Sequence, residues 1–210
     1  MADNFTVCVG TVGTGAWISP DGGESWKQVR AGLWAESRIF GFAVHPKQPR
    51  TLLAGADDGV YQSEDGGEHF ERLNSPMNTL HVWKVAYDPT DPNTIFAGTR
   101  PAALYRSADG GRHWEKLRAD MAEECPNVRI PRVTALTVDP SDHRIVWAGV
   151  EVDDLDEAAQ RLEHANARQL TAKDGLDMEM AQDTHRNFEM KWAGPDDVVI
   201  DISHTGWQTK

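Results

Sequence analysis

A short segment rich in turn-forming residues occurs three times in this chain at a constant spacing. The copies read SPDGGESW at 19–26, SEDGGEHF at 63–70 and SADGGRHW at 107–114, so their first serines are 44 residues apart both times. A fixed period of this size is typical of proteins built from repeated structural units. The flanking sequence repeats too, and three imperfect copies of one unit fill residues 5 to about 145.

Each unit is predicted to contain short β-strands. Apolar residues flank every Asp-Gly-Gly turn, as in WISPDGGESWKQV, which predicts a hairpin because glycine accepts the positive φ that such turns need. The segments FGFAVHP, VWKVAYDP and VTALTVDP predict a further strand that ends at proline, and LLAGA and IFAGT predict another. About four strands in a 44-residue unit is the size of one blade of a β-propeller.

The repeated pattern Ser-x-Asp-x-Gly-x-x-Trp resembles the Asp-box, or BNR, repeat of sialidase-like and sortilin-like β-propellers. The first and third copies carry the pattern in full, and the second copy has phenylalanine in place of tryptophan. The resemblance covers about two thirds of the chain and implies a propeller fold. The residues that carry it are Ser19, Asp21, Gly23, Trp26, Ser63, Asp65, Gly67, Phe70, Ser107, Asp109, Gly111 and Trp114.

We expect these Asp-box residues to be structural. Short Asp and Ser side chains can accept hydrogen bonds from backbone N–H groups of their own turn, and the aromatic ring can pack under the hairpin. The same residues in every repeat indicate a structural role, because catalytic residues do not need to recur in every blade. The alternative is that Asp21, Asp65 and Asp109 bind a ligand.

The resemblance to sialidases raises a glycosidase as an alternative. Such enzymes resemble one another in an Arg-Ile-Pro segment before the first box, an arginine triad and a tyrosine nucleophile. Here Arg129-Ile130-Pro131 follows the third box. The three tyrosines, Tyr61, Tyr87 and Tyr105, fall at repeat-equivalent or strand positions where core packing is expected. No pair of carboxylates suited to glycoside hydrolysis stands out from the repeats, so we predict no catalytic residue.

The repeat pattern stops near residue 150. IVWAG at 145–149 copies the opening of a fourth blade, but a helical pattern starting near Asp154 follows in place of a further Asp box. NFEMKWAG and VVIDISHTGW then predict two strands around a turn at 194–197.

This C-terminal part, through GVEVDDLDEAAQRLEHANARQL and WAGPDDVVIDISHTGW, resembles half of a glyoxalase/bleomycin-resistance domain of the vicinal oxygen chelate superfamily. The resemblance implies a metal-binding residue in the first strand of this half and another in its last strand. Trp147 and Asp201 occupy those positions. One carboxylate is too few for a metal site, so we expect no metal and no cofactor.

Together the patterns predict a mainly β protein with two parts. An incomplete β-propeller of about three Asp-box blades is expected at 1–149, and a small α+β module of order βαβββ at 150–210. One continuous strand at 147–151 is predicted to join them. Because open sheet edges favour pairing, we expect this strand, or the neighbouring strand around Val198 to Ser203, to be covered by a partner subunit or by the C-terminal segment, with a homo-oligomer as one possibility.

Composition and charge limit the remaining function classes. The net charge of −12 disfavours nucleic acid as a partner. No apolar run approaches the ~18 residues of a membrane-spanning helix. The N-terminal residues lack a secretion signal, and two cysteines are too few for a disulfide framework, so we expect residence in the cytoplasm.

The sequence therefore favours a non-catalytic binding or assembly protein with an unknown protein or carbohydrate ligand. The alternative is an enzyme, either a sialidase-like glycoside hydrolase or a glyoxalase/dioxygenase-type metalloprotein assembled between chains.

Overall fold

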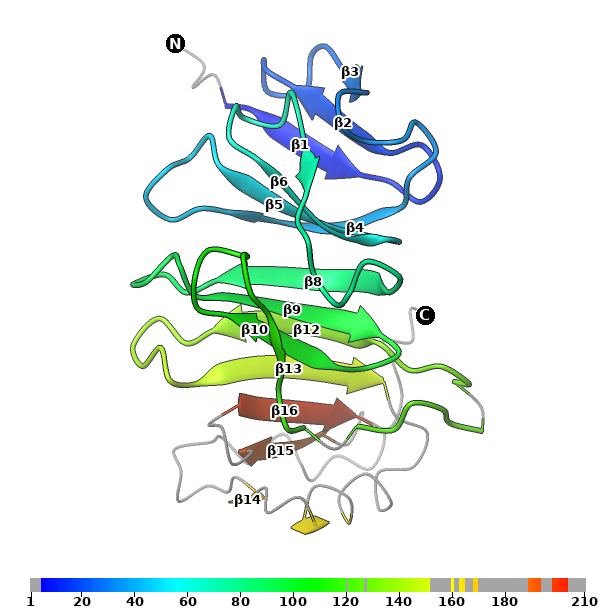
Figure 1. The fold of residues 1–210 in the computed structure, drawn as a ribbon, viewed down its shortest axis with the longest axis vertical. Helices are drawn as coiled ribbons and strands as arrows, with labels where there is room; N and C mark the ends of the chain where they lie inside the picture. Colours follow the sequence, from blue (N-terminus) through cyan, green and yellow to red (C-terminus); the bar gives the residue numbers. More distant parts are fainter. Residues whose placement is uncertain are drawn as a thin grey trace. The chain divides into compact units, whose positions relative to one another are not determined.

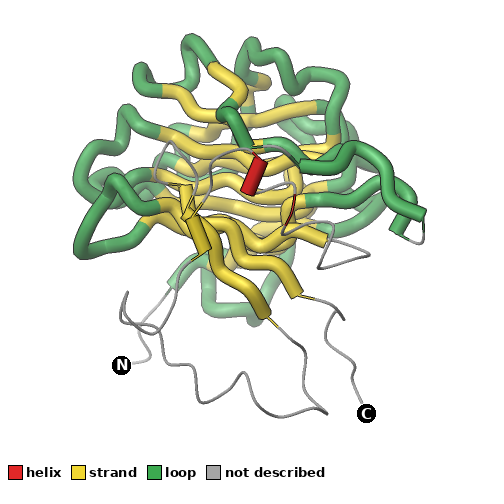
Figure 2. The backbone as a smooth tube through the Cα atoms, turned by 90° about the horizontal axis from the view of Figure 1, so that it is seen from below, coloured by secondary structure: helices red, strands yellow, loops and turns green. Residues whose placement is uncertain are grey.

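The computed structural model describes residues 5–119, 121–126, 128–151, 160, 163–164, 168–169, 189–193 and 198–203. Figure 1 labels most of its strands, and Figure 2 shows that nearly all described residues lie in strands or loops. None of the helical residues in these ranges belongs to a helix long and apolar enough to cross a membrane. The fold is mainly β, as predicted. The chain divides into two compact units, one of residues 1–97 with 106–115 and one of residues 98–105 with 116–210.

The first unit begins with a three-stranded antiparallel sheet. Its order is β1-β2-β3, with β1 at Val7–Gly10, β2 at Ala16–Ser19 and β3 at Lys27–Val29. β2 and β3 form the hairpin predicted around the first Asp box. Both glycines of that turn have positive φ, 75° at Gly22 and 106° at Gly23, which explains why the turn needs glycine.

A four-stranded antiparallel sheet follows in the same unit. Its strands are β4 (Ile39–Val44), β5 (Leu52–Ala56), β6 (Gly59–Ser63) and β7 (Glu71–Arg72), in the order β4-β5-β6-β7. β5 is buried along its whole length. The core of the first two sheets is formed by Ala16, Ile18, Val29, Leu33, Ile39, Leu52, Ala54, Ala56, Tyr61 and Phe70, with Cys8 and Phe42 packed against it.

The third sheet repeats the four-stranded arrangement. It contains β8 (His81–Tyr87), β9 (Ile95–Arg100), β10 (Leu104–Ser107) and β11 (Glu115–Lys116), in the order β11-β10-β9-β8. Within the first unit, β8 packs beside β4 (Figure 1), where the rings of Phe40 and Trp83 stack with centroids 4.2 Å apart. The prediction of four strands per blade is therefore confirmed for the second and third sheets.

The glycine before each Asp-box hairpin is explained by close contact with the next sheet. A Cβ atom on Gly10 would lie 2.6 Å from the carbonyl oxygen of Ile39. A Cβ on Gly55 would lie 2.5 Å from the carbonyl oxygen of Val82. Real Cβ atoms do not approach a backbone oxygen so closely, so these crossings have room only for glycine.

The second unit contains the predicted junction strand. Its sheet has the order β12-β13-β16-β15-β14, with β12 at Val133–Val138, β13 at Val146–Glu151, β14 at Arg168–Gln169, β15 at Glu189–Ala193 and β16 at Val198–Ser203. β13 pairs antiparallel with β12 and parallel with β16. The single strand predicted at 147–151 is confirmed, and the C-terminal segment of the same chain covers its second edge.

The other C-terminal predictions have mixed outcomes. β15 and β16 pair antiparallel, as predicted for NFEMKWAG and VVIDISHTGW, whereas the turn at 194–197 lies outside the described residues. The helix predicted to start near Asp154 also falls outside them, except for Gln160, Glu163 and His164, which are helical.

Candidate functional site

Each Asp box is organised around its buried serine. Ser19, Ser63 and Ser107 are no more than 1% exposed. In the second box, Ser63 Oγ donates to Asp65 Oδ1 at 2.8 Å and accepts a hydrogen bond from the Gly67 N–H at 2.9 Å. The first and third boxes contain the same two bonds, at 2.7 and 2.7 Å and at 2.9 and 2.9 Å. The serine thus links the acid to the second glycine of the turn.

The acid of the second box closes the other side of its loop. Asp65 Oδ1 accepts hydrogen bonds from the backbone N–H groups of Glu68 at 2.9 Å and His69 at 3.0 Å. These bonds favour the charged carboxylate, and the bond from the His69 N–H is the main cause that lowers the pKa of Asp65. The carboxylate oxygen is therefore bonded to its own turn.

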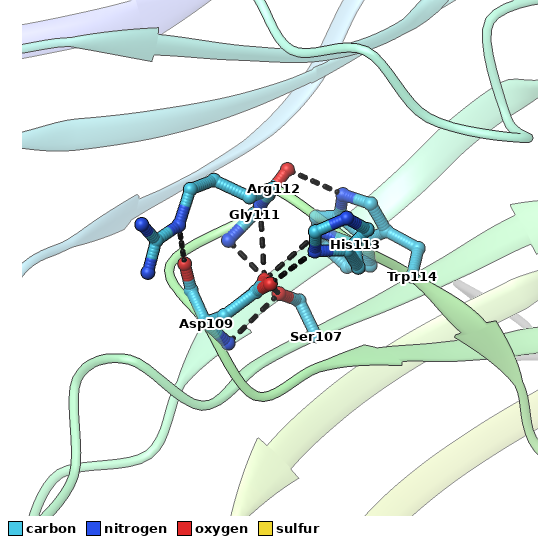
Figure 3. A network of polar contacts seen from close by, with 6 residues as sticks. All are labelled: Ser107, Asp109, Gly111, Arg112, His113 and Trp114. Atoms are coloured by element: carbon cyan, nitrogen blue, oxygen red, sulfur yellow. Dashed lines mark hydrogen bonds and ion pairs between the residues drawn. The ribbon is translucent and has the colours of Figure 1, made fainter.

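The third box has the densest set of contacts, and Figure 3 shows them around Asp109. Asp109 Oδ1 accepts from the N–H groups of Arg112 at 3.1 Å and His113 at 2.9 Å, and Asp109 Oδ2 lies 2.5 Å from His113 Nδ1. The backbone bond from His113 is the main cause that holds the pKa of Asp109 well below its usual range. Arg112 Nε also donates to the Asp109 carbonyl at 2.8 Å.

The first box reaches the same closure with a serine in place of the histidine. Asp21 accepts from the Ser25 N–H at 2.9 Å and from the Ser25 hydroxyl at 2.5 Å. The Ser25 hydroxyl is the main cause that lowers the pKa of Asp21 to about 2.

The aromatic residue of the box packs differently in the three copies. Phe70 lies in the core and is 1% exposed, whereas Trp26 is 43% exposed. Trp26 Nε1 donates to the Gly23 carbonyl at 3.0 Å, so the indole lies against its own turn. Trp114 Nε1 makes the equivalent bond at 2.9 Å, as seen in Figure 3. Phenylalanine has no such donor.

A second repeated turn connects the first and second strands of the sheets, and the sequence analysis did not single it out. Asp88 Oδ1 accepts from the N–H groups of Thr90 at 2.7 Å and Asp91 at 3.0 Å. Asp139 Oδ1 accepts from the backbone at Ser141 and Asp142 in the same way, and His45 Nδ1 accepts from the backbone at Lys47 and Gln48. The recurring His-Pro or Asp-Pro pair after each first strand was the available signal.

A groove of about 400 Å³ lies in the first unit between the first and second sheets. Its apolar wall includes Cys8 and Ile18 from the first sheet and Phe42, Val44 and Leu52 from the second. Among its polar lining residues, Lys27 Nζ lies 3.3 Å from Glu68 Oε1, and Arg50 Nη2 donates to the Asp65 carbonyl at 2.6 Å. The lining therefore carries charged side chains of both signs, of which Lys27 and Glu68 form an ion pair.

The residues considered for glycosidase chemistry contribute to packing or to loop structure. Tyr61 and Tyr105 are buried, and desolvation is the main cause that raises the pKa of Tyr61 to about 12. Arg129-Ile130-Pro131 lies in the loop before β12, where Arg129 and Cys125 exchange backbone hydrogen bonds of 2.7 and 2.8 Å. Within the described ranges, no three His, Cys, Asp or Glu side chains form a group that could hold a metal ion.

The Asp-box sheets define a segment of a β-propeller, and comparison with known proteins identifies its family. The model of the family Sortilin-Vps10, described as "Sortilin, neurotensin receptor 3", matches residues 58–205. This chain therefore belongs to the Sortilin-Vps10 family. None of the curated proteins matches it.

Solved structures with this fold include much longer enzymes. An ancestral GH74 enzyme has a TM-score of 0.60 at 17% identity, covering 90% of this chain and 26% of its own. The GH74 xyloglucanase from Xanthomonas campestris has a TM-score of 0.53 at 18% identity, covering 95% of this chain and 28% of its own. The chain thus spans about a quarter of the length of these enzymes. At this level of identity, the likeness shows the fold alone.

Proposed function

We propose that this protein is a non-catalytic binding or assembly protein built on Asp-box propeller repeats. The observation that carries the proposal is the local bonding of the repeated acids. Asp21, Asp65 and Asp109 each bond to the serine and the backbone of their own loop. A carboxylate whose oxygens bond to its own loop stabilises the hairpin. The repeats therefore form the framework of the fold, and the surfaces between them are left to bind a ligand.

The groove of the first unit supports a protein ligand ahead of a carbohydrate. Its apolar wall, formed by side chains such as Phe42 and Val44, suits the alternating apolar residues of a polypeptide. The charged side chains of its lining balance, two cationic and two anionic, so the groove does not attract a highly charged ligand.

A glycoside hydrolase is the second candidate. Two similar structures are GH74 enzymes, and one of them is named a xyloglucanase. Hydrolysis of a glycosidic bond would need two carboxyl groups roughly 5 to 9.5 Å apart that are free to act on a sugar. The Asp-box acids do not supply such a pair, because their oxygens bond to their own turns.

We further propose that the residues after about 149 form a glyoxalase-like half-module. The order β13-β16-β15-β14, with β13 parallel to β16, supports a βαβββ unit, because parallel neighbours need a long crossover connection between them. A metalloprotein assembled from two such halves would bind one divalent ion per site.

Residence in the cytoplasm stays a prediction.

Activity, metal content and equilibrium binding together test the proposal. The purified chain is incubated with xyloglucan and with a sialoside, and released sugar is compared with that from a heat-inactivated sample. We expect no release above that control, no stoichiometric divalent ion, and saturable binding to a protein or glycan ligand. Turnover of either substrate or one tightly bound ion per chain would overturn the non-catalytic function.

The variant Asp109→Ala tests the structural role of the box separately, because Asp109 does not line the groove. Since the backbone N–H groups of Arg112 and His113 lose their acceptor, we expect a lower melting temperature and, well below that temperature, unchanged affinity for any ligand found. Asp109→Asn is the matched control, since its amide oxygen can still accept hydrogen bonds. An unchanged melting temperature with abolished binding would assign Asp109 to a ligand site instead.

A further inference from the structure

The groove between the first and second sheets has an equivalent position between the second and third sheets. Gly10 lies against Ile39 at the first of these interfaces, and Gly55 lies against Val82 in the same way at the second. The two interfaces therefore have the same register, which together with the box serines defines equivalent positions. Equivalent pairs include Cys8 and Leu53, Val44 and Tyr87, Phe42 and Val85, and Pro20 and Glu64.

The phenol ring of Tyr87 packs at the interface between the second and third sheets. β8, which carries Tyr87, contacts β4, β5 and β6 of the second sheet. The Tyr87 ring meets the ring of His45 edge-on, with centroids 5.1 Å apart. Burial, followed by the nearby charge of Glu64, raises the pKa of Tyr87 to about 12. An aromatic ring is therefore part of the packing at this interface.

The first interface has smaller side chains at two of the equivalent positions. Leu53 is 0% exposed, whereas its counterpart Cys8 lines the groove. Val44, the counterpart of Tyr87, also lines the groove and is 56% exposed. The groove of about 400 Å³ thus includes space that larger side chains fill at the next interface. A cavity of about 150 Å³ already holds a benzene ring, so the groove has room for one aromatic ring.

The apolar lining of the groove suits such a ring. Phe42 corresponds to Val85 of the second interface, so the groove has an aromatic wall. Aromatic rings in contact attract each other beyond the effect of the area they bury. Pro20 corresponds to Glu64, so the acid that lies near Tyr87 has an apolar counterpart here.

The charged side chains of the lining complement the electron-rich face of a ring. Glu68 is paired with Lys27, and the Asp65 carboxylate accepts hydrogen bonds from its own loop. Arg50 is fixed against the second box, because its Nη2 donates to the Asp65 carbonyl at 2.6 Å and its carbonyl accepts from the Gly66 N–H at 2.7 Å. The anionic groups thus have partners within the protein, whereas a cation such as Arg50 attracts the negative face of an aromatic ring.

We propose that the groove binds one aromatic side chain, tyrosine or phenylalanine, of a partner protein. The ring occupies the position that Tyr87 has at the next interface, against Cys8, Phe42 and Val44. Because Val44 is largely exposed, the groove is open enough to admit a side chain whose backbone stays outside. This inference rests on the proposed binding function and names the group of the protein ligand that the groove binds.

Protection of Cys8 from alkylation tests the proposal at the site itself. The full chain is treated with iodoacetamide, with and without N-acetyltyrosinamide in the millimolar range, and alkylated peptides are quantified by mass spectrometry. Because Cys8 lines the groove, we expect the probe to slow its alkylation at least fivefold, in a saturable way. Cys125 does not line the groove, so it is the internal control and should change less than twofold.

A second probe isolates the contribution of the ring. N-acetylalaninamide has the same backbone without a ring and should protect neither cysteine. Absence of saturable protection by the tyrosine probe, or equal protection by the alanine probe, would overturn the proposal. A Cys8 that reacts only after the chain is unfolded in urea would show that the groove is already covered, and would overturn it too.

The variant Val44→Tyr tests the comparison between the two interfaces. The new ring should lie in the groove as Tyr87 does at the next interface, so Cys8 should be alkylated at least fivefold more slowly and the probe should have no further effect. Val9→Tyr is the matched control and should leave protection by the probe within twofold of wild type, because Val9 points to the opposite face of β1 from Cys8. Undiminished protection by the probe in Val44→Tyr would contradict the proposed position of the ring. The comparison of probes on the wild-type chain does not depend on how these variants fold.

Two further measurements separate other occupants of the groove. Protection by p-cresol at tenfold lower concentration than by N-acetyltyrosinamide would assign the groove to a free phenolic molecule, and the partner-protein proposal would be wrong. A dimer in sedimentation that dissociates in Val44→Tyr but not in Val9→Tyr would assign it to a second copy of this chain, with the same consequence. Failure of the probe tests leaves the proposed function standing if the protein still binds another ligand without turnover, so the two failures are distinguishable.

Discussion

The first and second sheets of the first unit contain the same Asp box in different surroundings. The serine bonds have nearly equal lengths, 2.7 Å in the first box and 2.8 and 2.9 Å in the second. Burial differs strongly, because Phe70 is 1% exposed and Trp26 is 43% exposed. The comparison teaches that the box closes its hairpin by local bonds alone, whereas the contribution of its aromatic residue depends on neighbouring sheets.

The largest expected effect is a difference in unfolding free energy between variants of the two aromatic residues, Phe70 and Trp26. Phe70→Ala should lower the free energy of unfolding by about 3 to 5 kcal/mol, because it leaves a cavity in the core between the first two sheets. Trp26→Ala should lower it by only about 1 kcal/mol, since this residue is already 43% exposed and one indole hydrogen bond is lost. Urea denaturation of both variants measures the difference. Equal losses would show that burial does not distinguish the boxes.

A substitution at the close contact between two sheets should have an intermediate effect on stability. Gly55→Ala should lower the free energy of unfolding by about 1 to 3 kcal/mol, because the new methyl group would meet the carbonyl oxygen of Val82 at 2.5 Å. Gly149→Ala, at the equivalent position in β13, is the matched control. Its nearest described neighbours, Thr134 Oγ1 at 3.1 Å and Ala135 Cβ at 3.2 Å, lie farther away than the Val82 oxygen does from Gly55, so a smaller shift makes room for the methyl group. A loss at Gly149 as large as that at Gly55 would contradict the assignment of the strain to the backbone contact.

The parts of the fold that could be predicted from the sequence are those with local signals. The Asp-Gly-Gly turn and the spacing of the strands depend on residues that are close in the sequence, so the hairpins and the four-stranded sheets could be predicted from them. The exposure of Trp26 did not, because it depends on which sheets surround the ring. The parallel pairing of β13 with β16 did not follow either, since it joins Val146 to Val198 across a long separation.

The candidate site was predicted only in part for a similar reason. The positions of Asp21, Asp65 and Asp109 in turns follow from sequence, and the structure adds that their oxygens accept from their own loops. The groove beside β1 could not be predicted, because it is formed by Phe42 and Cys8 from different sheets. Surfaces between repeats depend on packing, which no single repeat encodes.

The smallest expected effect is on the pH dependence of stability. It tests whether the acids of the first and second boxes contribute equally to that dependence. The pKa of Asp21 falls from 3.8 to about 2, mainly through the Ser25 hydroxyl, and the pKa of Asp65 is lowered mainly by the His69 N–H. A carboxyl with a lower pKa in the folded state binds protons more readily in the unfolded chain. Its stabilisation is therefore present above about pH 4 and is lost as the pH falls toward 2.

Urea midpoints measured at pH 6, 4, 3 and 2 test this sign and its origin. Both carboxylates are close to solvent, so each contributes a shallow slope, and the wild-type midpoint should fall between pH 4 and pH 2. Asp21→Asn and Asp65→Asn should each flatten that fall by a similar amount, whereas Glu124→Gln, an exposed acid outside the boxes, serves as the control. If Asp65→Asn alone flattens it, the surroundings of the second sheet, and not the bonds of the box, set the charge state of the repeated acid.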